Sequence, residues 1–159
     1  MEIFMEEAFI EARKAISAGE VPVGCVFIYN KEIIARGSND VNATKNATRH
    51  AEFVCIDQTL EFCKEKKLNW KNVFPEVSVV VTVEPCIMCA SALYELGVKE
   101  IIFGCANDRF GGKTVVDVES FYGKKITVTA GIRANEAMEL LKEFYKGENP
   151  SAPVPKTKR

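Results

Sequence analysis

Two short stretches of the chain carry residue types that serve metal-assisted chemistry. Residues 50–52 read His-Ala-Glu, and residues 85–89 read Pro-Cys-Ile-Met-Cys. A catalytic zinc site takes three nitrogen or sulfur ligands and keeps a fourth tetrahedral position open for water. His50, Cys86 and Cys89 offer that set, and two cysteines three positions apart at a helix start can both reach one ion. We therefore predict that these three residues bind one zinc ion.

Glu52 follows the histidine closely enough to lie beside the metal without binding it. Zinc lowers the pKa of a coordinated water to about 7. We predict that Glu52 is the catalytic proton carrier, which takes a proton from that water, delivers it to a ring nitrogen of a nucleobase and later protonates the departing amine. The order and spacing of the two stretches are typical of zinc-dependent nucleobase deaminases.

Each of these residues also has an ordinary explanation when taken alone. A single histidine is usually a surface or core residue, a Cys-x-x-Cys pair serves redox proteins and structural zinc sites, and a glutamate is common in helices. A structural zinc site needs a fourth ligand. The four other cysteines, which we expect to be small apolar core residues, are not spaced to supply it; they are Cys25, Cys55, Cys63 and Cys105.

The elements that must position these residues can be predicted from periodicity and turn residues. We expect amphipathic helices near residues 5–16, from 49 or 50 onward, at 85–97 and at 137–144, with Phe53, Ile56, Leu60 and Cys63 facing inward on the second. Strands are expected at 21–29, 32–36, 77–83, 100–104 and 126–129, the first two forming a hairpin at Asn30-Lys31. Loops are expected at 37–48 and 106–112. This alternation predicts an α/β fold, a three-layer α/β/α sandwich with a mixed five-stranded sheet.

Composition limits the remaining choices. The 159 residues, 47% of them hydrophobic and 27% charged, predict one deaminase domain over residues 1–147. Residues 148–159 are rich in proline and basic residues and are expected to form a flexible tail, in which Lys156, Lys158 and Arg159 either contact phosphates or remain solvated. No apolar run is long enough for a membrane span, and the acidic N-terminal residues do not resemble a signal peptide. We expect an intracellular protein, in the nucleus or the cytoplasm.

Further stretches carry a resemblance to a known family. The chain resembles the cytidine deaminase-like superfamily, and within it the tRNA adenosine deaminases, in residues 20–24 (Glu-Val-Pro-Val-Gly), Asn39, residues 50–52 and residues 83–90. Residues 46–49, 109–112, 144–146 and 148–150 are similar to the catalytic subunit of the eukaryotic enzymes. The resemblance implies hydrolysis of the wobble adenosine (position 34) of a tRNA to inosine. It also implies a heterodimer with a related subunit three that lacks the catalytic glutamate, although a homodimer in isolation stays open.

The same resemblance assigns roles to residues around the metal. Asn39 would hydrogen-bond the flipped base, and Val23 and Ala51 would line its pocket. By residue type alone, the commoner role of Asn39 is that of a turn residue between a strand and a helix. Arg109 and Phe110 could stack on or clamp the flanking nucleotides. The net charge of −1 provides no general field that attracts a polyanion, so RNA contacts must come from local patches or from the partner.

Three other functions remain compatible with these residues. A deaminase of a free base, nucleoside or nucleotide, such as guanine, cytidine or deoxycytidylate, would use the same metal and glutamate. A non-catalytic, zinc-stabilised RNA-binding scaffold subunit would not need Glu52. A dithiol redox protein would cycle Cys86 and Cys89 without metal. Substrate tests, a Glu52→Ala variant and metal analysis distinguish them.

Overall fold

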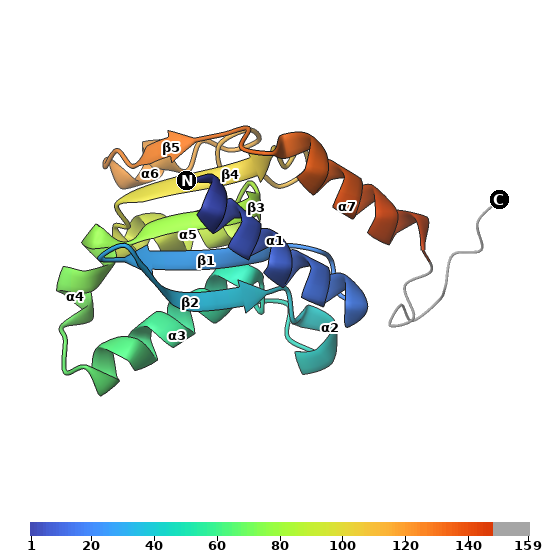
Figure 1. Ribbon diagram of the computed structural model, residues 1–159. Helices are drawn as coiled ribbons and strands as arrows, with labels where there is room; N and C mark the ends of the chain where they lie inside the picture. Colours follow the sequence, from blue (N-terminus) through green and yellow to red (C-terminus); the bar gives the residue numbers. More distant parts are fainter. Residues whose placement is uncertain (148–159) are drawn as a thin grey trace.

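The computed structural model describes residues 1–147, which fold around one mixed five-stranded sheet (Figure 1). The strands are β1 (Gly24–Tyr29), β2 (Glu32–Ser38), β3 (Ser78–Val83), β4 (Glu100–Cys105) and β5 (Thr127–Thr129). Their order across the sheet is β2-β1-β3-β4-β5. Strand β1 pairs antiparallel with β2 and β3, whereas β3, β4 and β5 are parallel. The predicted mixed sheet is confirmed.

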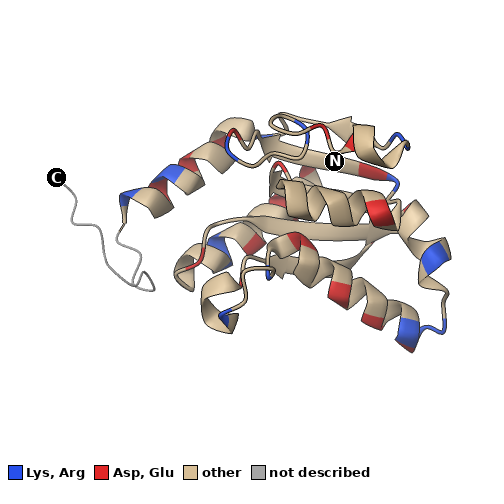
Figure 2. Ribbon diagram, turned by 180° about the vertical axis from the view of Figure 1, so that it is seen from behind, with Lys and Arg blue, Asp and Glu red and all other residues tan. Residues whose placement is uncertain are grey.

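Helices cover both faces of this sheet. Helices α1 (Glu2–Ser17) and α7 (Ala134–Lys146) lie over one face, and α3 (Ala51–Glu65) and α5 (Ile87–Leu96) lie over the other, which faces the viewer in Figure 2. Acidic and basic residues are interspersed along α7, whereas the only charged residue of α5 is an acidic one (Figure 2). The expected α/β/α sandwich is therefore confirmed.

The buried side chains of the strands explain why both faces need a cover. Along β3, Val79 and Val81 belong to the cluster under α3 and α5, while Val80 belongs to the cluster under α1 and α7. Ile101 and Ile102 divide in the same way on β4. Because successive side chains point to opposite faces of a strand, an unbroken apolar run buries both faces.

The hairpin between β1 and β2 forms where the sequence predicts it. Asn30 and Lys31 have φ angles of 50° and 66°, the left-handed pair that a two-residue hairpin turn requires. The first strand begins at Gly24 rather than at residue 21. Helix α1 packs closely there, since a Cβ atom on Gly24 would come 1.9 Å from the carbonyl oxygen of Ala8.

Several expected boundaries and orientations are wrong. Strand β2 continues to Ser38, and a short helix lies within the expected loop at 37–48. Leu60, expected inward on α3, is 39% exposed, because the sheet receives the side of α3 that carries Cys55 and Thr59. Four short helices were not predicted: α2 (Val41–Thr44), α4 (Trp70–Val73), the 3₁₀ helix η1 (Phe74–Glu76) and α6 (Glu119–Tyr122). Helices of three or four residues are too short for a periodic signal.

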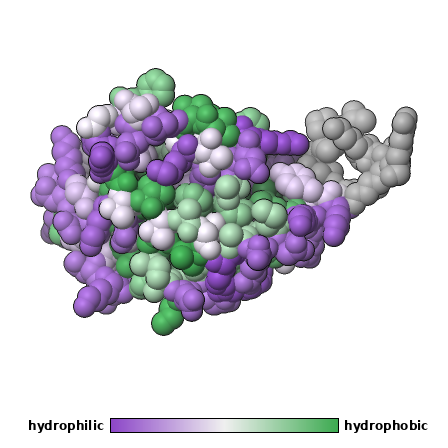
Figure 3. Space-filling view, turned by 90° about the horizontal axis from the view of Figure 1, so that it is seen from above, coloured by the Kyte–Doolittle hydropathy of each residue, from purple (hydrophilic) through white to green (hydrophobic). Residues whose placement is uncertain are grey.

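The surface and the remaining cysteines follow ordinary rules. Seen from above, hydrophilic side chains line the margins of the molecule and hydrophobic ones gather in the middle of that face (Figure 3). The cysteines outside the predicted metal set are free and buried, as expected of small core residues; they are Cys25, Cys55, Cys63 and Cys105.

Two further expectations concern the membrane and the C-terminal residues. Among residues 1–147, no helix has the length and hydropathy that a membrane crossing requires. The basic residues Lys156, Lys158 and Arg159 lie outside the described residues.

Candidate active site

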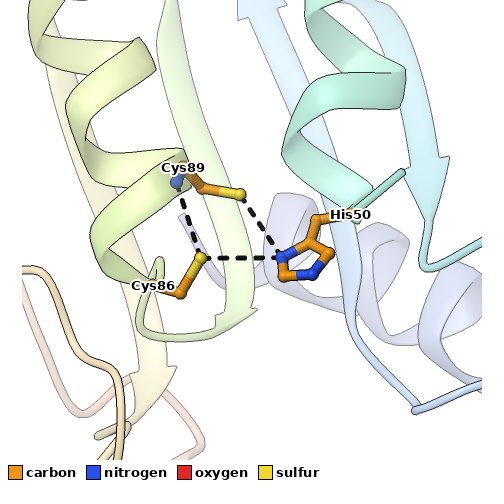
Figure 4. A group of neighbouring side chains, drawn as sticks. All are labelled: His50, Cys86 and Cys89. Carbon is orange, nitrogen blue, oxygen red and sulfur yellow. Dashed lines mark hydrogen bonds between the residues drawn. The ribbon is translucent and has the colours of Figure 1, made fainter. Parts of the chain in front are cut away.

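The predicted metal ligands occupy the first turns of two helices. His50 is the N-cap residue of α3, Cys86 is the N-cap residue of α5, and Cys89 lies in the first turn of α5. Figure 4 shows the three side chains pointing toward one another from the two helix starts. The backbone N–H of Cys89 points at the Cys86 sulfur, 3.5 Å away. The positive end of a helix dipole favours negative charge at such a place.

The distances within this group fit a zinc ion. The Nδ1 atom of His50 lies 3.6 Å from the Sγ atoms of both Cys86 and Cys89. Bond lengths of about 2.3 Å to sulfur and about 2.0 Å to nitrogen place two ligands of a tetrahedral zinc ion about 3.5 Å apart. No other His, Cys, Asp or Glu in residues 1–147 completes this group. His50, Cys86 and Cys89 therefore form a candidate zinc site of three ligands, the number that catalytic zinc centres use.

The two thiols differ in their tendency to ionise. Hydrogen bonds from Cys89 and His50 outweigh the effect of burial and lower the pKa of Cys86 to about 4. The hydrogen bond to Cys86, together with burial, raises the pKa of Cys89. The hydrogen bond with Cys86 also raises the pKa of His50. These contacts favour the thiolate form of Cys86, and the thiolate is the form that binds metals.

Glu52 is buried beside this group. It lies in the first turn of α3 and is only 3% exposed. Burial raises the pKa of Glu52 to about 7. A carboxyl group with a pKa near the working pH can both accept and release a proton, as general acid–base catalysis requires. The structure therefore places a suitable proton carrier next to the zinc ligands.

The sheet explains how residues 36 positions apart come together. Helix α5 begins just after the carboxyl end of β3 and connects β3 to the parallel strand β4. Helix α3 packs on the neighbouring strands β1 and β2 of the same sheet face, so that its first turn meets that of α5. In open α/β sheets, ligands bind beyond the carboxyl ends of the strands.

A cavity of about 660 Å³ opens above the metal ligands. Ligand pockets commonly have volumes of about 300–1,000 Å³. It is lined by Val21, Val23, Asn39, His50, Ala51, Glu52, Val83, Glu84, Cys86, Ala106, Asn107, Asp108, Arg109, Phe110, Leu141 and Tyr145. The structure thus brings every described residue with a predicted role to this cavity except Cys89, whose sulfur lies within 4.8 Å of the ligand atoms of His50 and Cys86.

The cavity has two parts with different surroundings. We call His50, Glu52, Cys86 and Cys89 the floor. The rim consists of Asn39, residues 107–110, Leu141 and Tyr145. Phe110 and Tyr145 are 62% and 67% exposed, so two aromatic side chains stand at the mouth of the cavity.

Asn39 is the rim residue with the clearest unused hydrogen-bonding capacity. Its backbone N–H donates to the carbonyl oxygen of Val23, but its side-chain Oδ1 atom is buried and has no hydrogen-bond partner among the described residues. Buried polar atoms normally have partners, and one without a partner in a cavity wall is free to accept a hydrogen bond from a ligand.

Sequence reasoning missed part of the rim. Asn107 and Asp108 lie in the loop already expected at 106–112, so their polar side chains were an available signal. Leu141 was expected only as a residue of the last helix, and Tyr145 had no assigned role. Local sequence does not reveal that α7 ends over the cavity.

Comparisons with known proteins agree with this site. Residues 1–105 match the family model described as the cytidine and deoxycytidylate deaminase zinc-binding region. A relative from Danio rerio, tRNA-specific adenosine deaminase 2, is 49% identical over 164 residues, covering 100% of this chain and 77% of that protein. The tRNA-specific adenosine deaminase subunit tad2 of Schizosaccharomyces pombe is 42% identical over 161 residues, covering 99% of this chain and 40% of that protein.

A solved structure shows the same arrangement of elements. It comes from studies of A-to-I editing by tRNA:A34 deaminases at the wobble position of transfer RNA. The TM-score is 0.77 at 28% identity, and the match covers 89% of this chain and 100% of that chain. Together with the zinc ligands, the buried glutamate and the extent of these matches, the likeness shows that the chain belongs to the zinc-binding cytidine and deoxycytidylate deaminase family, and within it to the tRNA-specific adenosine deaminases.

Proposed function

We propose that this chain hydrolyses adenosine to inosine at position 34 of tRNA anticodons, as the catalytic subunit of a heterodimer inside the cell. The observation that carries the proposal is the buried Glu52 beside a three-ligand zinc site at the base of an open cavity. Relatives that bear the names of tRNA adenosine deaminases match the chain over its full length, which supports this choice of substrate.

The reaction needs water, a Lewis acid and a group that moves protons. His50, Cys86 and Cys89 would hold the zinc ion, which would act as the Lewis acid that activates water. Glu52 accepts a proton from the attacking water and delivers it to a ring nitrogen of the adenine. As the bond from carbon to the amino group breaks, Glu52 transfers the second proton of the water to the departing nitrogen. Adenosine and water thus give inosine and ammonia.

The cavity suits a single base that leaves its stack. Val23 and Ala51 provide apolar walls, and the Oδ1 atom of Asn39 is available to a donor on the base. Arg109 and Phe110 are exposed at the rim, where a guanidinium and an aromatic ring can stack on flanking nucleotides. An anticodon base is already unpaired, so moving it into the cavity costs less than opening a duplex.

A second subunit completes the proposal. The near-neutral net charge gives this chain little general attraction for RNA. The name of the fission yeast relative identifies that protein as one subunit of a deaminase. We take the partner to be a related subunit three without the catalytic glutamate, which adds tRNA-binding surface. The basic residues Lys156, Lys158 and Arg159 would contribute further phosphate contacts.

The test is an editing assay with defined components. The chain is co-expressed with a candidate subunit three, the zinc content is measured, and a tRNA with adenosine at position 34 is sequenced for inosine. The chain alone and a Glu52→Gln variant are run in parallel. Glu61→Gln, an exposed residue on the same helix, is the matched control.

Inosine that depends on both Glu52 and the partner supports the proposal. A folded, zinc-loaded complex that edits no such tRNA contradicts it, and free bases, nucleosides and nucleotides then become the substrates to test. Editing that persists in Glu52→Gln would show that another group moves the proton.

A further inference from the structure

Two glutamates outside the metal centre are buried as deeply as Glu52. Glu20 is 1% exposed and Glu84 is 3% exposed. Neither forms an ion pair with a basic residue in residues 1–147. Burying a carboxylate without a partner charge is costly unless hydrogen bonds replace its hydration. The groups that donate these hydrogen bonds therefore indicate what each glutamate holds in place.

Glu84 binds the loop that follows β4. Its carboxylate accepts hydrogen bonds from the backbone N–H groups of Asn107 (3.2 Å), Lys113 (3.1 Å) and Thr114 (3.0 Å), and from the Thr114 hydroxyl. One side chain thus fixes both ends of the segment that carries Asp108, Arg109 and Phe110.

The same loop is joined to the start of the cysteine helix. The backbone N–H of Ile87 donates to the carbonyl oxygen of Phe110 at 2.7 Å, and Gly111 pairs with Cys86 in an isolated β-bridge. Glycine is required at position 111, since a Cβ atom there would lie 2.2 Å from the Glu84 carboxylate. Glu84 therefore sets the position of Phe110 relative to the metal ligands.

Glu20 holds the segment on the other side of the cavity. Its carboxylate accepts hydrogen bonds from the backbone N–H groups of Asn42 (3.1 Å) and Ala43 (2.8 Å), at the start of α2. Asn39 lies just before this helix, with its backbone joined to Val23. The backbone N–H of Asp40 donates a hydrogen bond to the carbonyl oxygen of Arg49, the residue before the metal ligand His50. Through these hydrogen bonds, Glu20 connects the segment that contains Asn39 to the residues that follow α1.

The two segments flank the cavity in the sheet. Asn39 follows β2 and residues 106–114 follow β4, with β1 and β3 between these strands. Strands β2, β3 and β4 run in the same direction, so their carboxyl ends meet at one edge. The two glutamates therefore act on opposite walls of one cavity.

We propose that Glu20 and Glu84 are positioning residues. They hold the Asn39 segment and the loop of residues 106–114, which carries Phe110, at the distance from each other that a substrate nucleotide needs above the zinc site. This inference rests on the proposed function. Neither carboxylate touches the reacting atoms; each acts through backbone N–H groups of a wall segment. Their effect falls on substrate binding and alignment, while the metal ligands stay in place.

The experiment uses the zinc-loaded complex and compares Glu84→Gln and Glu20→Gln with wild type. In either orientation, the glutamine amide directs N–H donors at backbone N–H groups that the carboxylate now accepts, so the wall must shift. We expect KM for the tRNA to rise and kcat/KM to fall between about tenfold and hundredfold, because small misplacements of a bound substrate have effects of this size. Zinc content and the visible spectrum of the Co²⁺-substituted protein should match wild type.

Two further variants keep the test informative. Thr114→Val removes one donor to Glu84 and should give a smaller change in the same direction, even if Glu84→Gln does not fold. Glu11→Gln alters a buried glutamate on α1 that pairs with Lys14 away from the cavity, and it should leave KM unchanged.

Unchanged kinetics in folded Glu84→Gln and Glu20→Gln, with only a lower Tm, would overturn the inference in favour of a purely structural role. Loss of zinc, or an altered Co²⁺ spectrum, would also overturn it, because the glutamates would then act on the metal centre. Failure of the proposed function appears differently, as an absence of inosine with wild-type complex.

Discussion

The floor and the rim of the cavity are built from different kinds of structure. The floor residues His50, Glu52, Cys86 and Cys89 all sit in the first turns of helices that pack on the central sheet. The rim comes from two loops and the end of α7, and it includes the exposed Phe110 and Tyr145. Sites on helices are held more precisely than sites on loops, and the loops of this rim are fixed by hydrogen bonds to Glu20 and Glu84. The residues with a proposed role in the chemistry therefore lie at helix starts, and those with a proposed role in substrate contact lie mainly on loops.

The comparison predicts that changes in the floor abolish the reaction, whereas changes in the rim weaken binding. The largest effect is expected from removing a ligand. In Cys86→Ser, the chain should lose most of its zinc, and inosine formation should fall below detection, because two ligands hold the ion poorly. Metal analysis and the editing assay measure both. Cys63→Ser, a buried cysteine away from the metal, is the control and should keep its zinc.

The second prediction separates the two functions of the floor. Glu52→Gln should retain one zinc per chain and lower kcat by about 10²–10⁴, since the amide cannot carry the proton. Zinc content and single-turnover editing rates provide the measurement. If the variant loses zinc as Cys86→Ser does, Glu52 supports the metal and the division of the floor is wrong.

Asn39 tests the part of the rim that offers a buried hydrogen-bond acceptor. Asn39→Ala should lower kcat/KM for tRNA by roughly fivefold to 150-fold, which corresponds to one buried hydrogen bond of about 1–3 kcal/mol. Zinc content should not change. Asn72→Ala on α4, which alters an exposed asparagine, should have no effect. An Asn39→Ala variant with wild-type kinetics would remove this residue from the substrate-binding rim.

Phe110 tests the outer rim. Stacking of one base on an aromatic ring contributes about 1–3 kcal/mol. Phe110→Ala should therefore raise KM for tRNA by about fivefold to hundredfold and leave kcat nearly unchanged. Phe121→Ala, which removes another exposed phenylalanine outside the cavity, is the matched control. An equal rise in KM for both variants would show that exposed aromatic side chains in general, and not those of the rim, contribute to substrate binding.

The smallest effect is expected where α7 is anchored. Glu6 binds Arg133, which precedes α7, and this hydrogen bond and that from Arg13 lower the pKa of Glu6 below its ordinary 4.5. The stability that Glu6 contributes is therefore present above pH 4.5 and is lost as the pH falls through the lowered value. Because the side chains of Glu6 and Arg133 are 44% and 28% exposed, solvent screens their attraction, and Glu6→Gln should lower the free energy of unfolding by less than about 1 kcal/mol at neutral pH.

Unfolding in denaturant at neutral and acidic pH checks that prediction. The difference between Glu6→Gln and wild type should disappear in acid. Editing by the variant should equal that of wild type at neutral pH. A large rise in KM would instead show that the position of the rim depends on this contact between Glu6 and Arg133.

Features set by neighbouring residues could be read from the sequence. The spacing of Cys86 and Cys89 after Pro85 indicated two ligands on one helix start, and the structure confirms that placement. Asn30-Lys31 indicated a hairpin turn, because asparagine tolerates the left-handed conformation at little cost. The apolar run in β3 indicated a strand covered on both faces. These signals are local, so no knowledge of the partner elements was needed.

The remaining features depend on contacts between distant segments. The sequence placed Leu60 in the core by helical spacing, but the orientation of α3 on the sheet selected Cys55 and Thr59 instead. It gave no sign that Glu20 and Glu84 bind backbone groups more than twenty residues away. By itself the sequence determined which residues could bind zinc and move a proton. Only the tertiary structure decided how far apart they lie and which loops wall the cavity, because those distances arise from packing over the whole sheet.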